Sequence, residues 1–544
     1  MRGVPMRGVP MQARWFRPAE TAAAFVLAAL FYASLYGQLP YHDAARFAAQ
    51  LESGRFVFDL GHVLLQPAAL LWHRTLGFGE TVVASQKHLN TAAAAAAVAI
   101  LYGLLARLGC ARWVAAAAAV LAAASCDTIT LAPSAHFKLV ALPFVNGALA
   151  VLALAEAGGR ARRASVAVAG GALLAVGAGF FAGVLTTPPF AGLALMAAAR
   201  REGAGWPRAL LQAVLLGGAC ALTFAVLACA TFALVTDGPV SAQGFAAALA
   251  DKQAVRPPDQ VLLNQAARAV FGTVNNFIAS PGLGAVIRAW LNGEIPTLRP
   301  YARALLLVSV PWAATALLLG LTYVRAGGAA LRGRRCLVPL AFLAGAQLWA
   351  VGYNLNDPEH WVNLTAPTLV LFATVLPPAA VAVGLPAWAA LTVAANLALF
   401  AIPTAGYPLA RYEAEMRERF TPRDLLVHFA AYPGRAYLGF FDLAGLRKLK
   451  LDVLYEQSPS EAAFFAALDR AFLETLRDGG RVVVFDVLDG TDWEAPWPSL
   501  AIRGLTKDAL YSHLASRFAI TRQPSIAELE VWQVALPPGT RPGT

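Results

Sequence analysis

The chain has 544 residues, of which 58% are hydrophobic and only 14% are charged, and its mean hydropathy is +0.57. Because soluble globular proteins carry roughly a quarter charged residues, this composition excludes an ordinary soluble enzyme and is typical of a protein that crosses a membrane many times. The net charge of +11 does not indicate nucleic acid as a partner, since the arginines gather in short loops between apolar runs.

Apolar runs that approach the thickness of a bilayer recur through the first three quarters of the chain. They span residues 21–38, 89–106, 113–131, 139–156, 165–185, 188–199, 209–236, 302–324, 337–353, 362–383 and 385–403. The sequence therefore predicts a polytopic α-helical membrane domain over residues 1–404, with about 11 transmembrane helices.

Basic residues mark every second short loop between these runs. Arginines precede the first predicted span and follow the second, fourth, sixth and eighth. The positive-inside rule places these loops in the cytoplasm. The loops 39–88 and 237–301, the stretch 354–361 and the region after residue 404 then lie outside, and all 8 histidines fall on that side. We therefore expect any chemistry on the extracytoplasmic side.

The first outer loop opens with "GQLPYHDAARFAAQLESGRF", which places Asp43 at the start of a short amphipathic helix. In one interpretation Asp43 is a helix N-cap and Gly54 ends the helix. In the other, the carboxylate at the membrane edge is a general base that takes a proton from a hydroxyl. His42 is its neighbour, and Arg46 shares its helical face, where it could attract a phosphate.

The same loop continues with "DLGHVLLQPAALLWHRTLG", which is too interrupted by charge to be an ordinary span. It predicts an apolar segment that re-enters or skirts the outer leaflet. His62 precedes this proline-broken segment and is a candidate binding residue. His73 and Arg74, at its other end, can also be interpreted as interfacial residues that cap the helix.

Two later outer segments carry further candidates. In "APSAHFKLVALPF", Lys138 either snorkels to the interface or pairs with a phosphate, with His136 close by in sequence. In "GYNLNDPEHWVNLTAPTLVL", Glu359 and His360 either belong to a capped turn or contact donor or acceptor, and Trp361 is predicted to anchor at the membrane interface. A helix near 258–278 is amphipathic enough to lie on the membrane.

From about residue 405 the composition becomes that of a soluble domain. Helices are predicted near 411–430, 459–478 and 506–517, and strands at "AYLGFF", "RVVVFDVL", "FAITRQ" and "AELEVWQVAL". This alternation predicts a small α/β domain over residues 405–544, on the extracytoplasmic side. It contains no Walker or Rossmann glycine fingerprint.

Taken together, the aspartate after the first span, the short helix, "GHVLLQPAALLWHRTLG" and the span "LNTAAAAAAVAILYGLLARLG" resemble the opening of GT-C-type integral membrane glycosyltransferases, particularly bacterial ones. The resemblance covers residues 20–160 by motif and 1–404 by layout. It implies a bacterial inner-membrane enzyme that moves a sugar from a polyprenyl-phosphate carrier to an extracytoplasmic lipid, glycan or protein acceptor. Asp43 matches the catalytic base, and one displacement would invert the anomeric carbon.

The chain also departs from the family pattern. Many members carry a second acidic residue in the next outer loop, where this chain has His136 and Lys138, and its proline is displaced from His62 to Pro67. The missing carboxylate argues against a strongly metal-dependent mechanism, so no cofactor is indicated and a divalent metal is left open. The substrate-binding residues implied are His42, Arg46, His62, His136, Lys138, Glu359 and His360.

Two interpretations compete with an active enzyme. One is a transporter or a lipid- or glycan-binding membrane protein without transferase activity, for which Asp127 near the outer end of the third span is the main intramembrane charge. The absence of a repeat between the halves of the chain disfavours a transporter. The other is an inactive GT-C relative that uses its outer α/β domain as a binding module.

Overall fold

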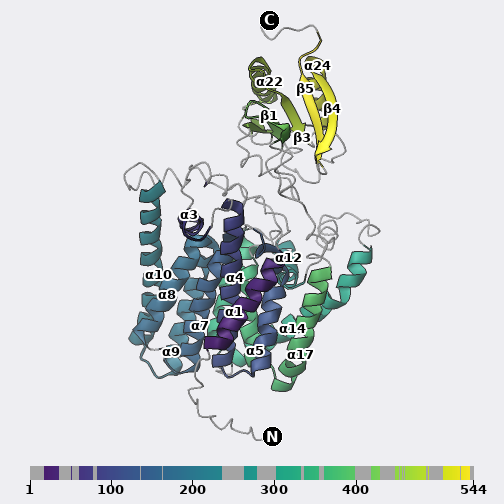
Figure 1. Ribbon diagram of the computed structural model, residues 1–544. Coiled ribbons are helices and arrows are strands. Elements are labelled where there is room, and N and C mark those ends of the chain that lie inside the picture. The colour runs from purple at the N-terminus through teal and green to yellow at the C-terminus, as the bar shows by residue number, and fades with distance from the viewer. Residues whose placement is uncertain are drawn as a thin grey trace. The chain divides into compact units, whose positions relative to one another are not determined.

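The computed structural model describes residues 18–35, 51, 61–77, 82–134, 137–161, 163–235, 262–278, 302–331, 336–353, 361–398, 418–428, 447–451, 454–455, 458, 460–485, 488, 506–526 and 529–538. These residues belong to two compact units, one made of helices and one built on a five-stranded sheet (Figure 1). The predicted boundary between residues 404 and 405 lies outside the described residues, so it stays a prediction.

The helical unit is a bundle of apolar helices. Its described helices include α1 (Pro18–Ala33), α4 (Val82–Arg107), α5 (Arg112–Ala124), α7 (Leu142–Ala157), α8 (Ala164–Phe180), α9 (Thr187–Arg201), α10 (Trp206–Val235), α14 (Ala302–Leu331), α15 (Leu337–Tyr353), α16 (Thr365–Val375) and α17 (Pro378–Asn396). Among the described residues, 6 helices are long and apolar enough to cross a membrane, and shorter apolar helices accompany them. The protein is an integral membrane protein, as the composition predicted.

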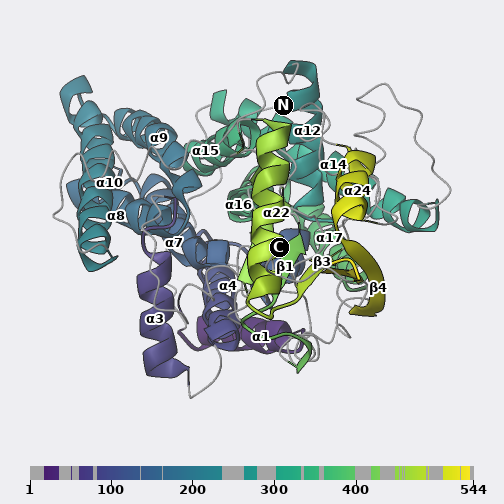
Figure 2. The same cartoon turned by 90° about the horizontal axis from the view of Figure 1, so that it is seen from above.

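Viewed along the bundle, α8, α9 and α10 form one side and α14 and α17 lie on the other (Figure 2). Close helix contacts depend on glycine in α8, because a Cβ at Gly170 would lie 2.8 Å from the Leu152 side chain of α7. A Cβ at Gly171 would collide with the Leu216 carbonyl oxygen of α10. These glycines therefore allow the backbone of α8 to pack closely against α7 and α10, as small residues commonly do between membrane helices.

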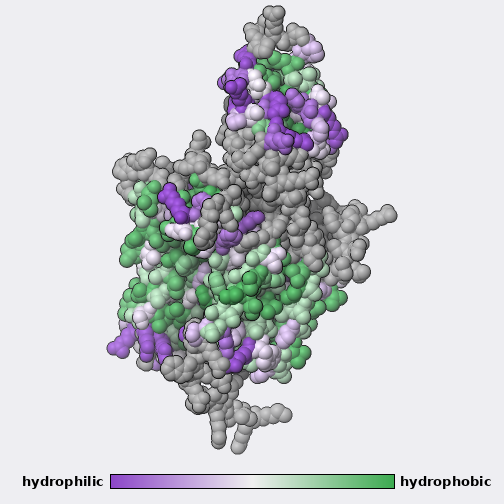
Figure 3. Space-filling model, viewed as in Figure 1, coloured by the Kyte–Doolittle hydropathy of each residue, from purple (hydrophilic) through white to green (hydrophobic). Residues whose placement is uncertain are grey.

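The two ends of the bundle differ in composition. Arginines gather at the end where α4 and α9 finish and where α5 and α10 begin. We call this the basic end, defined by Arg107, Arg112, Arg160, Arg163, Arg200, Arg201 and Arg208. In Figure 3, hydrophobic residues cover the middle of the unit and hydrophilic ones appear toward both ends.

Short helices occupy the opposite end, which we call the α3 end. It contains α3 (Leu65–Leu76), α6 (Cys126–Leu131), η1 (Phe137–Ala141), η2 (Ala182–Thr186), α12 (Leu262–Asn275) and η5 (Val362–Leu364). The predicted segment that skirts the membrane forms α3, whose 12 residues are too few to span a bilayer.

The break between the last two spans was predicted at the wrong place. The hydropathy placed it after residue 383, whereas α16 ends at Val375 and α17 begins at Pro378. Pro377 is extended, with φ −59° and ψ 141°, and proline at the start of α17 needs no backbone N–H there. Proline geometry, which hydropathy does not measure, sets this boundary.

The predicted helix near 258–278 forms as α12, but it does not simply lie on the membrane. Val274, Asn276 and Phe277 at its end are buried in the bundle. A Cβ at Gly272 would collide with the Trp361 ring, so the two segments pack in direct contact. Trp361 is therefore a buried packing residue, and its predicted place at the membrane interface was wrong.

The second unit has the strand order β2-β1-β3-β5-β4. The strands are β1 (Leu425–His428), β2 (Arg447–Lys450), β3 (Val482–Phe485), β4 (Ala519–Ile526) and β5 (Leu529–Ala535). β1 runs parallel to β2 and β3, while β5 runs antiparallel to β3 and β4. Helices α22 (Glu461–Arg477) and α24 (Lys507–Arg517) complete an α/β unit, and α22 packs Phe464, Leu468 and Phe472 into its core.

Most described elements of this unit were predicted. The helices near 459–478 and 506–517, the strand in "RVVVFDVL" and the terminal strand pair are confirmed. The helix predicted over 411–430 was wrong at Leu425–His428, which is the fully buried strand β1, because periodicity does not separate a short buried strand from a helix. The polar strand β2 was missed, and "AYLGFF" lies outside the described residues.

Candidate functional site

Of the predicted site residues, His62 and Lys138 lie in the described part of the chain. The predicted base and the remaining binding residues, Asp43, His42, Arg46, His136, Glu359 and His360, lie outside the described residues, so their placement stays a prediction. The site is therefore built here from His62, Lys138 and the elements that hold them.

His62 and Lys138 converge on the turn that follows α8. The His62 ring lies 2.8 Å from the Phe180 carbonyl oxygen through Nδ1. Because a carbonyl only accepts, Nδ1 donates and carries the proton. The Nζ atom of Lys138 lies 5.2 Å from the centre of the Phe181 ring. Two residues that the sequence singled out in separate loops thus contact adjacent residues.

Backbone hydrogen bonds fix the His62 segment on this turn. The amide of Leu64 donates to the Gly179 carbonyl at 2.8 Å, and the amide of Ala182 donates to the Gly61 carbonyl at 3.0 Å. Gly179 has no room for a side chain, since a Cβ there would lie 2.6 Å from the Leu64 side chain. The chain before α3 is therefore clamped against the junction of α8 and η2.

The Lys138 side chain is buried inside the helical unit. It lies on η1 and is only 4% exposed. A buried ammonium needs compensating interactions, and the face of the Phe181 ring supplies one of them. The alternative interpretation, in which Lys138 snorkels into water, does not hold, because a snorkelling lysine keeps its head exposed.

Aromatic side chains form the wall behind Lys138. The rings of Phe181 and Trp349 pack edge to face with centroids 5.7 Å apart. A Cβ on Gly183 would lie 2.6 Å from both the Phe181 ring and the Trp349 ring nitrogen. The Thr186 hydroxyl donates to the Gly345 carbonyl at 2.7 Å and so joins η2 to α15. Sequence reasoning missed this wall, whose signal was the doublet "FFAG" after a glycine-rich helix.

A layer of buried polar groups lies at the same end of the bundle. Asn90 of α4 donates to the Leu131 carbonyl at 2.6 Å, and Thr91 donates to the Ala132 carbonyl at 3.0 Å. Asn276 donates to the Thr365 hydroxyl at 3.0 Å. These bonds satisfy polar groups that apolar surroundings would otherwise penalise.

Asp127 belongs to this layer. The residue is 1% exposed, and its amide donates to the Asn276 carbonyl at 3.4 Å, which ties α6 to α12. An ionisable residue buried within a membrane bundle marks a functional candidate. The sequence named Asp127 only in connection with a transporter, and the structure places it among the polar groups of the α3 end.

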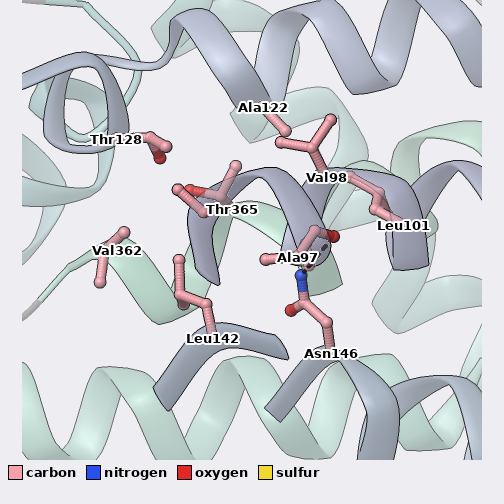
Figure 4. A pocket seen from close by; sticks show the side chains of 11 residues that line it. Ala97, Val98, Leu101, Ala122, Thr128, Leu142, Asn146, Val362 and Thr365 are labelled. Carbon is pink, nitrogen blue, oxygen red and sulfur yellow. Dashed lines mark hydrogen bonds between the residues drawn. The ribbon is translucent and has the colours of Figure 1, made fainter. Parts of the chain in front are cut away.

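A small cavity lies next to this layer, between α4, α5, α7 and α16 (Figure 4). Thr128, Asn146 and Thr365 line it, and Asn146 donates to the Ala97 carbonyl at 3.1 Å. The cavity encloses about 20 Å³, which is room for about one water molecule. It is too small for a sugar, so a substrate would have to bind elsewhere at this end.

Side chains that bind metals do not cluster among the described residues. Within those ranges, no group of three or more His, Cys, Asp or Glu side chains could hold a metal ion. Metal dependence stays a prediction, because most of the predicted acidic and histidine candidates lie outside these ranges.

Among the described residues of the sheet unit, the carboxyl group of Asp424 has a shifted pKa. Its carboxylate accepts the Arg481 amide at 2.8 Å, the Arg481 guanidinium at 2.7 Å and the Thr421 amide at 2.8 Å. Burial raises the pKa of Asp424, but the hydrogen bonds from Arg481 and the two amides, with the Arg481 charge, outweigh it and lower the pKa overall. Asp424 therefore fastens β1 to the start of β3.

Comparison with solved structures shows the fold. The structure matches the crystal structure of ArnT from Cupriavidus metallidurans bound to undecaprenyl phosphate, with a TM-score of 0.55 and 13% identity, over 95% of this chain and 98% of that one. The same protein in the apo state gives a TM-score of 0.46 at 12% identity over 95% and 98%. The S. cerevisiae protein O-mannosyltransferase Pmt1-Pmt2 complex bound to the sugar donor gives 0.34 at 15% over 40% and 35%.

The chain has the fold of a GT-C-type membrane glycosyltransferase. The fold class expected from the sequence, a polytopic helical membrane protein with a small C-terminal α/β domain, is confirmed. No protein-family model and no curated protein matches the chain by sequence.

Proposed function

We propose that this protein is a membrane glycosyltransferase that moves a sugar from a polyprenyl-phosphate carrier to an extracytoplasmic acceptor. The observation that carries the proposal is the convergence of His62 and buried Lys138 on the turn after α8, within a GT-C-type fold. The related structure with the same fold is described as bound to undecaprenyl phosphate, which supports a carrier of this chemistry.

Lys138 is the group that we assign to the phosphate of the carrier. In a region of low dielectric constant a cation attracts an anion far more strongly than it does in water. The Phe181 ring is one of the groups that contact the Lys138 ammonium, and a ring face stabilises a cation without neutralising its charge. His62 and its clamp on α8 fix the adjacent wall of the site.

Asp43 is the group that we assign to the acceptor. It takes the proton of the acceptor hydroxyl as that oxygen bonds to the anomeric carbon. The bond from the anomeric carbon to the phosphate oxygen breaks at the same time, and the phosphate leaves with the electron pair. Lys138 stabilises the negative charge that develops on the phosphate. One displacement from the opposite face inverts the anomeric carbon.

We place the enzyme in a bacterial inner membrane, with the α3 end and the sheet unit on the extracytoplasmic side. The arginines of the basic end support this orientation through the positive-inside rule. The acceptor is a lipid, a glycan or a protein. The alternative, a lipid- or glycan-binding protein without transferase activity, rests on the missing second carboxylate near His136 and Lys138.

The test uses the full chain in nanodiscs with synthetic polyprenyl-phosphate hexoses and pentoses. Lys138→Met should weaken binding of polyprenyl phosphate about tenfold to a hundredfold, because hydrogen bonds to a charged group contribute about 1.5–3 kcal/mol. Lys138→Arg should retain much of the binding, and Lys448→Met in the sheet unit is the matched control.

The outcomes separate the candidate functions. Sugar transfer by the wild type with weakened carrier binding in Lys138→Met supports the enzyme. Carrier binding by the wild type without turnover of any donor supports the binding protein. Wild-type affinity for polyprenyl phosphate in the Lys138→Met variant contradicts the assignment of Lys138.

A further inference from the structure

A groove runs along α1 on the surface of the helical unit, with α4 and α5 as its walls. It encloses about 520 Å³. Every third or fourth residue of α1 lines it, from Glu20 in the first turn to Phe31 near the last. Alanines of α5, such as Ala116, form the opposite wall, and their small side chains leave the space open. The groove therefore follows one face of α1 for most of the helix.

The lining of this groove is apolar apart from one end. In the membrane, the groove therefore faces lipid hydrocarbon. That end lies at the membrane interface on the basic side of the bundle. Trp113, adjacent to Arg112 at the start of α5, is 48% exposed. Exposed tryptophans at the end of an apolar helix mark the level of the lipid headgroups.

A pair of opposite charges stands at this end of the groove. The Tyr102 hydroxyl donates to Glu20 Oε2 at 3.0 Å, and Arg112 Nε lies 3.4 Å from Glu20 Oε1. The side chains of Glu20 and Arg112 are 30% and 63% exposed, so both can be reached from the membrane. Among the described residues Arg112 pairs with Glu20 alone, through Nε, which leaves its two terminal nitrogens for an anion.

We propose that this groove binds a glycerophospholipid whose headgroup joins a phosphate to a primary ammonium. One acyl chain lies along α1 between Tyr102, Leu27 and Phe31. The phosphate accepts hydrogen bonds from the terminal nitrogens of Arg112, which suit a phosphate by their fork geometry. The ammonium donates to the Glu20 carboxylate, which Tyr102 holds in place.

The charge pair selects this occupant over the others that an apolar groove could take. An isoprenoid tail offers no charged group to Glu20 and Arg112 at the end of its chain. A lipid with an anionic headgroup and no amine pairs with Arg112 but meets repulsion from Glu20. A quaternary ammonium has no N–H to donate to a carboxylate. Only the primary ammonium headgroup pairs with both charges.

The experiment measures lipid retention by the purified full chain with native mass spectrometry. The probes are phosphatidylethanolamine, phosphatidylcholine and phosphatidylglycerol with identical acyl chains. The wild type should retain phosphatidylethanolamine about tenfold better than phosphatidylcholine, the effect of one hydrogen bond between charged groups. Glu20→Gln should remove this preference, and Arg112→Gln should lower retention of all three lipids.

Two bulky variants test the groove itself. Ala116→Phe places a ring in the groove and should abolish retention of phosphatidylethanolamine. Val26→Phe adds a ring on the exposed face of α1 outside the groove and should leave retention unchanged. Because Glu20→Gln adds no bulk, it tests the proposal even where Ala116→Phe does not fold.

Three results overturn the proposal. The first is equal retention of phosphatidylethanolamine and phosphatidylcholine by the wild type. The second is a loss of bound polyprenyl phosphate in Ala116→Phe with unchanged phosphatidylethanolamine, which assigns the groove to an isoprenoid tail. The third is a dimer of the wild type that Ala116→Phe converts to a monomer without loss of lipid, which assigns the groove to a second copy of the chain.

Discussion

The two ends of the helical bundle use buried charge in opposite ways. At the basic end, the carboxylate of Glu156 accepts the amides of Leu337 and Val338 at 3.0 and 3.1 Å. At the α3 end, buried Lys138 lies over the Phe181 ring instead. A carboxylate that accepts two amides at a helix start stabilises that helix, whereas the contact of a cation with a ring face leaves the charge of the cation unchanged.

This difference separates residues that stabilise the bundle from residues that are candidates for substrate binding or catalysis. Glu202 repeats the pattern of the basic end, since it accepts the Ala161 amide at 2.9 Å and closes the loop between α7 and α8. The α3 end carries the His62 clamp, the aromatic wall and buried Asp127. We therefore expect substitutions at the α3 end to change substrate binding or turnover, and substitutions of Glu156 and Glu202 at the basic end to change stability.

The largest effect is expected from the proposed base. Asp43→Asn should lower the rate of sugar transfer about 10²–10⁴-fold, the usual contribution of general acid–base catalysis, without changing carrier affinity. The measurement is turnover of a polyprenyl-phosphate sugar alongside equilibrium binding of the carrier. Glu52→Gln, an acid in the same outer loop, is the matched control. Full turnover in Asp43→Asn would remove Asp43 from the mechanism.

The second prediction concerns the Glu156 carboxylate at the basic end. Glu156→Ala should destabilise the protein by about 3 kcal/mol, because it leaves the amides of Leu337 and Val338 at the start of α15 without this acceptor. Glu156→Gln keeps one acceptor oxygen and should cost less. Thermal unfolding of the full chain in detergent measures both variants. An unchanged unfolding temperature in Glu156→Ala would show that this carboxylate is not a structural cap.

The third prediction concerns the clamp beneath His62. Gly179→Ala should cost about 1–3 kcal/mol of stability, because its Cβ would lie 2.6 Å from the Leu64 side chain. It should also weaken carrier binding by displacing His62. Gly218→Ala on α10 is the control, since nothing lies within 4 Å of a Cβ there. Equal carrier affinity in the two variants would mean that the clamp does not position the site.

The smallest effect is expected in the sheet unit, where Asp424 accepts backbone amides as Glu156 does, but outside the membrane-spanning helices. The pKa of Asp424 is lowered in the folded protein. Its contribution to the stability of the folded sheet unit is therefore complete above the unfolded pKa of about 3.9. The contribution is lost as the pH falls through the lower folded value.

Hydrogen exchange of peptides that cover β1 and β3 measures this effect in the full chain between pH 6 and pH 3, after correction for the intrinsic exchange rate. Protection should decline toward pH 3 in the wild type and should be lower but flatter with pH in Asp424→Asn. Identical pH profiles of the wild type and the variant would contradict the assignment.

Much of the fold could be predicted because its signals are local. Hydropathy located the apolar helices, and alternating patterns located α22, α24, β3, β4 and β5. The failures occurred where local signals conflict or are weak. Proline geometry moved the break before α17, a short buried run made β1 look helical, and the polar strand β2 carried no apolar pattern.

The candidate site was only partly predictable. Chemistry alone singled out His62 and Lys138 from the residues of the outer loops. Their shared contact with the turn at Phe180 and Phe181 joins His62 to a residue 118 positions away. No sequence pattern in either loop predicts a contact between residues so far apart in the chain. The aromatic wall was missed for the same reason.

The sequence by itself determined that this protein lies in a membrane, which segments form most of its apolar helices, and that an α/β unit follows them. These properties depend on the transfer of side chains from water and on local backbone preferences, which each segment carries independently. Only the tertiary structure decided which charges are buried and what they contact. Glu156 caps a helix that begins 181 residues away, and such a contact exists only once the helices have packed.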